Sequence, residues 1–464
     1  MQEELNIAEI QEEVIEQVEE QEFYSQQDEG DDDVNPVNGR VFIEKKDLTL
    51  REYQMMRSDG DLLLQPSYQR KFVVDIKFAS RLIESIILDV PIPPVFLAEE
   101  EDGRYSVVDG QQRLTSFISF LDGNFPDEKK TVFKLTGVER LGSDLKGKTF
   151  NQIEDVAIRN KIKTTSIQAI ITKNSSHPDL KFQIFERLNT GAVKLNEDEL
   201  RNTIFRGSYI ELLAELEKDE SFHSLVRKDS FRKRMIYRGM ILRFFALSEK
   251  SYINYKSSMK QFCNKELRDH QNMVESKKQE YVERFKKCVE LVRIVFGENA
   301  FRRFLSGDET NANGKWVTSR VNMGIFDIQM CGFVNYTKSQ VVPKADEIRE
   351  RLLDLMTNNQ EFINTIENKT NDTSVLKKRF EIWFKELESI IGRGTPDTRV
   401  FKVADKKALY SADPTCKICN QQILIIEDSE VDHINPFSKG GKTDLLNAQI
   451  THRYCNRAKG NQVA

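Results

Sequence analysis

The sequence predicts an α+β multidomain protein with a mixed α/β N-terminal domain, a helical middle and a small C-terminal domain. The first observation is length, because 464 residues exceed one ordinary core and favour about three domains. The second is a hydrophobic content of 39%, which is enough to bury such cores. The third is a change along the chain from short alternating segments to long helical ones, and then to a cysteine-rich end.

The chain begins with an acidic tail over residues 1–38. Residues 1–33 contain fourteen Asp and Glu and no Lys or Arg, so the net charge of −5 hides a body with 69 basic and 60 acidic groups, a net of +9. The composition favours a solvated, disordered segment. Two alternatives stay open: an amphipathic helix, or docking of the tail on the basic body in competition with nucleic acid.

Residues 39–205 alternate short strands with amphipathic helices, which indicates a mixed α/β domain. The expected strands lie at 41–43, 95–98, 105–108 and 166–171, and the expected helices at 75–88 and 111–121.

Longer helical segments fill residues 206–392 and predict a helical domain, with helices at 279–296, 344–356 and 376–391. Residues 393–399 contain Gly394 and Pro396 and indicate a linker. Residues 400–464 form a small terminal domain.

Several classes of protein are disfavoured by the sequence. No apolar run approaches 18 residues, so no membrane contact is expected, and the acidic start disfavours a secretory signal. Cys263, Cys288 and Cys331 are scattered singly in predicted helices and are interpreted as buried thiols. A reducing cytoplasm is the expected compartment.

The last fifty residues hold the most specific motif. Cys416 and Cys419 form one pair, and His452 and Cys455 form a second pair with the same spacing. Three thiolates and one imidazole are typical of a closed tetrahedral Zn²⁺ site, which is structural rather than catalytic. A domain of this size has a small core and is stabilised by such a metal.

Between these pairs lies an Asp432-His433 dipeptide, which places a hard oxygen ligand beside a base that titrates near neutrality. Together with the flanking Cys and His pairs, it strongly resembles the HNH (ββα-metal) nuclease family in its zinc-stapled form. The resemblance extends from Cys416 to Gly460.

The resemblance implies a role for each motif residue. Asp432 would bind a catalytic Mg²⁺ or Mn²⁺, and His433 would activate water. Asn447 would hold the loop that orients His433, Asn456 would be the second ligand of the catalytic metal, and Lys459 would approach the phosphate. This sequence departs from the family pattern by having Asn at 456, a weaker ligand than His, which leaves the metal preference open.

A second motif follows the predicted strand at 105–108. Asp109 and Gly110 form a sharp turn, and Gln111, Gln112 and Arg113 then occupy the first turn of a helix. Helix N-termini favour anions, so this turn is a candidate phosphate site. The alternative is an ordinary cap with surface polar residues.

Further segments resemble the N-terminal domain of the GmrSD family, which has a DGQQR signature and a ParB-like fold. The resemblance implies nucleoside triphosphate binding coupled to cleavage of foreign or modified DNA. It adds these residues to the same nucleotide-binding cleft: Tyr68, Gln69, Arg70, Arg187, Asn189 and Thr190.

We therefore expect a nucleotide-regulated, Mg-dependent DNA endonuclease of the phage-restriction type, with NTP hydrolysis as a further activity that the family allows. The alternatives are a non-cleaving, nucleotide-switched DNA-binding protein and a zinc-held interaction module. The sequence leaves open the target, the nucleotide and its effect, the role of the tail, and whether the chain forms a homo-oligomer.

Overall fold

The structure is a computed structural model that describes residues 40–64, 75–100, 102–126, 131–138, 140, 144–176, 178–188, 196–249, 252–256, 258–392, 401–437 and 441–460. The predictions for the acidic tail and for the 393–399 linker lie outside these residues.

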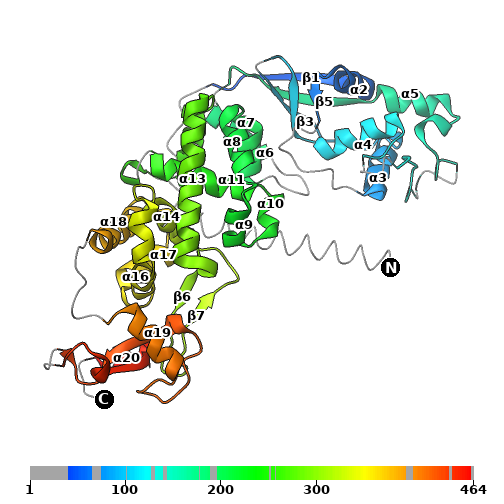
Figure 1. Cartoon of the computed structure of the whole chain (residues 1–464). Coiled ribbons are helices and arrows are strands. Elements are labelled where there is room, and N and C mark those ends of the chain that lie inside the picture. Colours follow the sequence, from blue (N-terminus) through cyan, green and yellow to red (C-terminus); the bar gives the residue numbers. More distant parts are fainter. Residues whose placement is uncertain are drawn as a thin grey trace.

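Three parts of the chain follow one another through the molecule (Figure 1). A sheet with its helices forms one end, helices that include the long α13 form the middle, and the segment with α19 and α20 forms the other end. None of the helices in the described residues has the length and hydropathy needed to cross a membrane.

The N-terminal part is built on a five-stranded mixed sheet with strand order β1-β5-β3-β4-β2. Strand β5 pairs antiparallel with β1 and parallel with β3, and β3 pairs antiparallel with β4. The strands are β1 Ile43–Thr49, β2 Leu62–Leu63, β3 Val95–Glu99, β4 Tyr105–Asp109 and β5 Ser166–Thr172. Four helices accompany the sheet: α2 Leu50–Asp59, α3 Ile76–Ile87, α4 Gln111–Asp122 and α5 Val156–Thr164.

Strand β1 starts at Ile43, whereas the sequence predicted a strand at 41–43. Its sequence IEKKDLT is mostly polar, so periodicity does not reveal it. All seven residues pair with β5, and β1 lies at the edge of the sheet, where charged side chains are tolerated.

The two faces of the sheet contribute to different cores because successive side chains on a strand point to opposite sides. Leu97 and Val107 belong to the core formed with the four N-terminal helices. Their neighbours Ala98 and Val108 belong to the core of the helical part. The central strands β3 and β4 are therefore buried on both faces, and they join the N-terminal part to the helical part.

The helical part contains α6 Pro178–Leu188, α7 Glu197–Ile204, α8 Ser208–Leu216, α9 Glu220–Val226, α10 Asp229–Lys233, α11 Ile236–Glu249, α12 Met259–Asp269, α13 Glu275–Phe296, α14 Met323–Gly332, α15 Lys338–Val341, α16 Ala345–Asn358, α17 Gln360–Glu367 and α18 Thr373–Ile391. The core of this part already includes Phe182 and Phe185 of α6. Packing thus groups α6 and α7 with the helices, although the sequence placed the domain boundary at residue 205.

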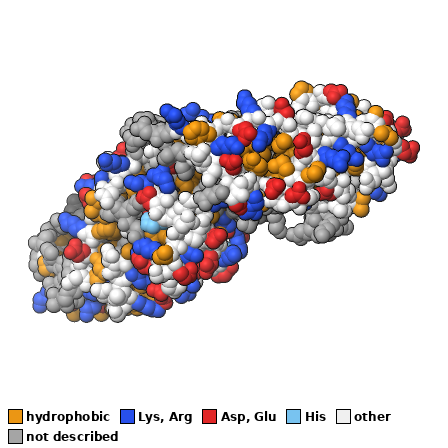
Figure 2. Space-filling model, turned by 90° about the horizontal axis from the view of Figure 1, so that it is seen from above, with side chains coloured by type: hydrophobic (Ala, Val, Ile, Leu, Met, Phe, Trp, Pro, Cys, Tyr) orange, Lys and Arg blue, Asp and Glu red, His pale blue; other side chains and the backbone are white. Residues whose placement is uncertain are grey.

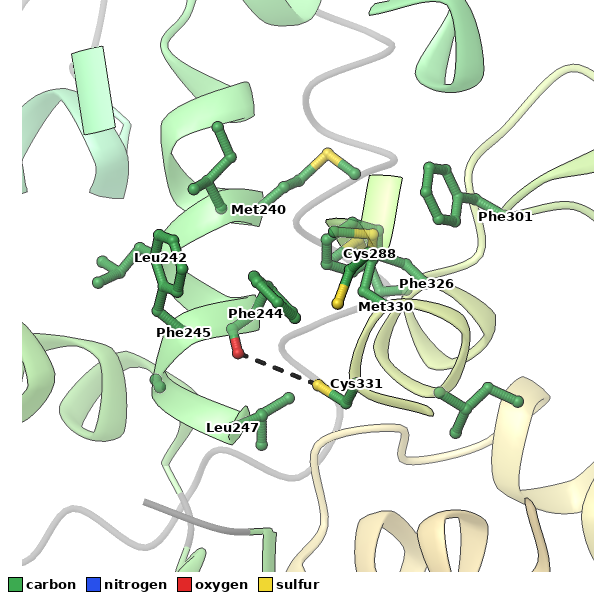
Figure 3. Close-up of a cluster of buried hydrophobic side chains, with 14 of the residues drawn as sticks. Met240, Leu242, Phe244, Phe245, Leu247, Cys288, Phe301, Phe326, Met330 and Cys331 are labelled. Carbon is green, nitrogen blue, oxygen red and sulfur yellow. Dashed lines mark hydrogen bonds between the residues drawn. The ribbon is translucent and has the colours of Figure 1, made fainter. Parts of the chain in front are cut away.

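Helices α11, α13 and α14 meet in the centre of this core, which Figure 3 shows. Cys263, Cys288 and Cys331 are all buried free thiols, as predicted. Burial raises the pKa of Cys263 and of Cys288 to about 12, so both stay protonated and unreactive at neutral pH. The Cys331 thiol points at the carbonyl oxygen of Phe244, 4.0 Å away.

The C-terminal part consists of α19 Val403–Ala412, β8 Ser429–His433, β9 Ala448–His452 and α20 Arg453–Lys459. Strands β8 and β9 form an antiparallel pair, with His433 opposite Ala448 and Ser429 opposite His452. A second hairpin, β6 Arg303–Leu305 and β7 Lys315–Val317, lies in the helical part, where the sequence predicted only helices. Figure 1 places this hairpin next to α19.

Candidate functional site

The four predicted zinc ligands come together at one point. The ligand atoms of Cys416, Cys419, His452 and Cys455 all lie within 4.8 Å of one another. His452 Nδ1 lies 3.4 Å from Cys419 Sγ and 3.8 Å from Cys455 Sγ. Ligands about 2.3 Å from a tetrahedral Zn²⁺ are separated by about 3.8 Å, so the donor set fits this ion.

The environment of Cys416 also suits a metal. Burial opposes ionisation of its thiol, but the backbone N–H groups of Cys419, His452 and Ile418 donate toward the sulfur. The net effect lowers the pKa of Cys416, which favours the thiolate that Zn²⁺ binds.

Asp432 and His433 end strand β8 and are both partly exposed. The ring of His433 packs near two aromatic rings, with centroid distances of 4.5 Å to Phe401 and 6.0 Å to Phe437. Burial lowers the pKa of His433, and nearby Lys459 lowers it further, while Asp432 opposes the change. The net pKa is below the usual value, so the imidazole is neutral at neutral pH and can accept a proton.

One nitrogen of His433 already has a partner. Nε2 lies 3.0 Å from the hydroxyl oxygen of Thr443. With the ring proton on Nε2, this N–H donates a hydrogen bond to the Thr443 hydroxyl oxygen, and the lone pair of Nδ1 is the basic site. Thr443 was not among the residues singled out from the sequence.

Asn447 lies against the loop that follows His433. Its side-chain oxygen accepts the Asn435 N–H at 2.8 Å, and its amide donates to the carbonyls of Asn435 and Lys442 at 3.0 and 2.8 Å. The Ile434 N–H donates to the Asn447 carbonyl at 3.0 Å. Four bonds from one residue hold this loop beside the histidine.

Asp432 accepts two hydrogen bonds through the same oxygen. Lys459 Nζ lies 2.6 Å from Asp432 Oδ2, and Gln449 Nε2 donates to that oxygen at 2.8 Å. The sequence had assigned Lys459 to the substrate phosphate, whereas here its ammonium neutralises the carboxylate expected to bind metal. A divalent cation at Oδ2 would compete with this ammonium for the same oxygen.

Asn456, on α20, donates from Nδ2 to Glu430 Oε2 at 2.8 Å. Glu430 also accepts Arg453 Nη1 and Arg457 Nη2 at 3.0 and 2.9 Å. Glu430 precedes Asp432 by two residues on β8, so both side chains emerge on one face of the hairpin. This alternation is the sequence signal that could have identified Glu430.

The second motif lies where β4 turns into α4. Gly110 has φ +89°, and a Cβ there would lie 2.6 Å from Val95 Cγ1, so only glycine fits. No side chain caps the N-terminus of α4, which leaves its first N–H groups without that partner.

Arg113 is held by protein groups. Its Nη2 pairs with Asp109 Oδ2 at 2.8 Å, and its Nη1 donates to the carbonyls of Pro93 and Pro94 at 2.6 and 3.2 Å. Arg187 is exposed at the end of α6. The other residues assigned to this cleft from the sequence lie outside the described residues: Tyr68, Gln69, Arg70, Asn189 and Thr190.

A ββ-hairpin followed by a helix, closed by a Cys₃His metal cluster and presenting an Asp-His pair, defines a ββα-type nuclease domain. Residues 416–462 match the family model of HNH endonucleases. Residues 50–206 match the model of the GmrSD restriction endonuclease N-terminal domain. The chain therefore joins a GmrSD N-terminal domain to a C-terminal HNH endonuclease domain, and it is a restriction-type nuclease. No curated protein matches the chain.

Proposed function

We propose that this chain is a nucleotide-regulated, divalent-metal-dependent endonuclease that hydrolyses phosphodiester bonds in foreign or modified DNA, as in phage restriction. Residues 400–464 would cut, residues 39–205 would bind nucleotide, and residues 206–392 would connect the two. The observation that carries this proposal is the environment of His433, which combines a lowered pKa, a partnered Nε2 and a loop held by Asn447.

Hydrolysis of a phosphodiester needs a base for water and stabilisation of charge on the phosphate. His433 would take the water proton on Nδ1, while Thr443 and the aromatic rings keep the imidazole in place. Bound Mg²⁺ or Mn²⁺ would act as a Lewis acid on the phosphate and the leaving oxygen. Asp432 and Asn456 would hold it, and Lys459, displaced from Asp432, would then turn toward the phosphate.

Electrostatics favour a weakly bound substrate. Lys and Arg are interspersed with Asp and Glu over the face shown in Figure 2, without one continuous basic field. Phosphate contacts supply most non-specific DNA affinity, so we expect salt-sensitive binding that needs a second signal before cutting. One such centre cuts one strand, so a double-strand break would require two nicks or a homo-oligomer.

A nucleoside triphosphate is the proposed second signal. The uncapped N-terminus of α4 supports a phosphate site formed by the N–H groups of Gln111 and Gln112. Asp109 and Gly110 would shape the turn, and Arg113 would stabilise it by bonding the Pro93 and Pro94 carbonyls. Calorimetric titration with each NTP, and phage DNA cleavage with and without it, test this part.

The catalytic assignment is tested by nicking of supercoiled plasmid in Mg²⁺ or Mn²⁺. Loss of a general base costs roughly a hundredfold or more, so His433→Ala should abolish detectable nicking while zinc content stays unchanged. Asp432→Asn should do the same. Asp413→Asn removes the same charge from an exposed ion pair with Lys417 in this domain and should keep full activity. Undiminished nicking by His433→Ala would refute the role of His433.

A further inference from the structure

The loop between β6 and β7, which belongs to the helical part, contacts residues of the zinc cluster. Asn313, one residue before the last glycine of this loop, bonds the segment that follows Cys419. Its side-chain oxygen accepts the Leu424 N–H at 3.0 Å, and its amide donates to the Gln422 carbonyl at 3.3 Å.

The same oxygen of Asn313 also meets a zinc ligand. It lies 3.3 Å from His452 Nε2, and the two residues are 139 positions apart in the chain. His452 is completely buried, with Nδ1 turned toward the thiols of Cys419 and Cys455. The two ring nitrogens therefore face different groups, one the metal cluster and the other an amide oxygen.

This arrangement fixes the protonation of the ring. An imidazole that binds a metal through Nδ1 carries its proton on Nε2, and that N–H needs an acceptor when it is buried. An amide oxygen is such an acceptor, and Asn313 supplies one beside the backbone carbonyl of Gln422, which also bonds the ring. Acceptors of this kind orient the ligand and strengthen its bond to the metal.

Further hydrogen bonds and ion pairs join the helical part to the nuclease domain near His452. The Gly314 N–H donates to Asp428 Oδ2 at 2.8 Å. Glu350 of α16 pairs with Lys406 at 2.7 Å and with Arg453, the residue after His452. The zinc cluster thus lies at the contact between the helical part and the nuclease domain.

We propose that Asn313 is a positioning residue for the zinc ligand His452, so that the zinc affinity of the nuclease domain depends on its docking against the helical part. By linkage, zinc binding strengthens the docking by the same factor. Zinc then does more than stabilise a small domain, because it also strengthens the contact between the nuclease domain and the helical part. The helical part in turn contacts the N-terminal part. The proposal rests on zinc occupying the Cys₃His cluster.

The test measures zinc affinity of the full-length chain by competition with a chromophoric chelator, independently of DNA cleavage. Asn313→Leu keeps the size of the side chain and removes the side-chain acceptor, which leaves only the Gln422 carbonyl beside the ring, so zinc should bind roughly 10- to 100-fold more weakly. Asn313→Asp keeps an acceptor for both N–H groups and should retain affinity to within a few-fold. The absorption spectrum of the Co²⁺-substituted chain should shift in Asn313→Leu and not in Asn313→Asp.

A matched control removes an ion pair at the exposed edge of the same contact surface. Lys407 pairs with Asp346 at 2.8 Å, and because both side chains are exposed the pair contributes little to docking. Lys407→Met should therefore leave zinc affinity unchanged.

Unchanged affinity in Asn313→Leu, or equal weakening in Asn313→Asp, would overturn the orienting role. If Asn313→Leu does not fold, a tenfold loss in Asn313→Asp would overturn it as well. A wild-type chain that binds no zinc would refute the zinc site and this role together.

Discussion

Asp428 is buried where the nuclease domain contacts the helical part, and its ionisation should make the free energy of unfolding depend on pH. Its side chain is fully buried, it accepts the Gly314 N–H through Oδ2, and Oδ1 has no hydrogen-bond partner in the described residues. Burial raises the pKa of this carboxyl from 3.8 to about 6, and the Gly314 N–H only partly opposes the rise. The fold therefore favours the protonated form.

The sign of the pH effect follows from this. Below about pH 3 the carboxyl is protonated in both the folded and the unfolded state, and burial has no ionic cost. As the pH rises, the unfolded chain releases its proton first, so stability falls until the folded carboxyl also ionises near pH 6. A rise of the Asp428 pKa from 3.8 to about 6 lowers the free energy of unfolding by about 3 kcal/mol at pH values above 6.

Asp428→Asn removes the ionisation and keeps an oxygen for the Gly314 N–H. Relative to wild type, this variant should gain about 1.5 kcal/mol between about pH 5 and pH 8, where roughly half of the full penalty develops. Urea denaturation with saturating zinc, followed by the emission of Trp316 and Trp383, measures the difference in unfolding free energy. Comparing variant with wild type at each pH cancels the titration of all other groups.

A carboxylate of the β6–β7 loop, which contains Gly314, provides the control. Hydrogen bonds from Thr310 and Asn311 lower the pKa of exposed Asp308 from 3.8, so Asp308→Asn should lose stability relative to wild type only as the pH rises toward about 4. Between about pH 5 and pH 8 its difference from wild type should stay constant. A difference between Asp428→Asn and wild type that does not vary with pH would show that Asp428 is not a buried, proton-binding group.

Two further outcomes are expected. Gly110→Ala should lower the free energy of unfolding by about 2 kcal/mol or more, because φ +89° is strained for alanine and the new Cβ would lie 2.6 Å from Val95 Cγ1. Gly103→Ala, at φ +82° with open space around it, should cost about 1 kcal/mol, and equal thermal shifts would contradict the steric argument. Thr443→Val should slow plasmid nicking roughly tenfold or more without loss of zinc, because the Nε2 partner of His433 is removed. A wild-type nicking rate would show that Thr443 does not orient the ring.

Local patterns were sufficient to predict much of the fold. Strands β3, β4 and β5 and helices α3 and α4 lie where periodicity placed them, because each has a regular apolar face. The polar edge strand β1 and the three-residue strands β6 and β7 were not recovered, since pairing with distant segments, rather than their own composition, makes them strands.

The candidate site divides in a similar way. The zinc ligands and the Asp-His pair were found because metal chelation and turn geometry require close spacing along the chain, and the structure brings the four ligand atoms to one point. Thr443 and Phe401 were missed, because an ordinary Thr or Phe has no distinguishing spacing until the fold places it beside His433. Glu430 was missed although its position two residues before Asp432 on a strand places both on one face.

The sequence by itself determined the chemistry of the chain: a Cys₃His cluster, an Asp-His pair and a glycine turn ahead of a helix. Only the tertiary structure decided how these groups are supported. Asn313 meets His452 across 139 residues, and Glu350 meets Arg453 across 103. Such contacts depend on how whole helices and hairpins pack, and no local pattern encodes that packing.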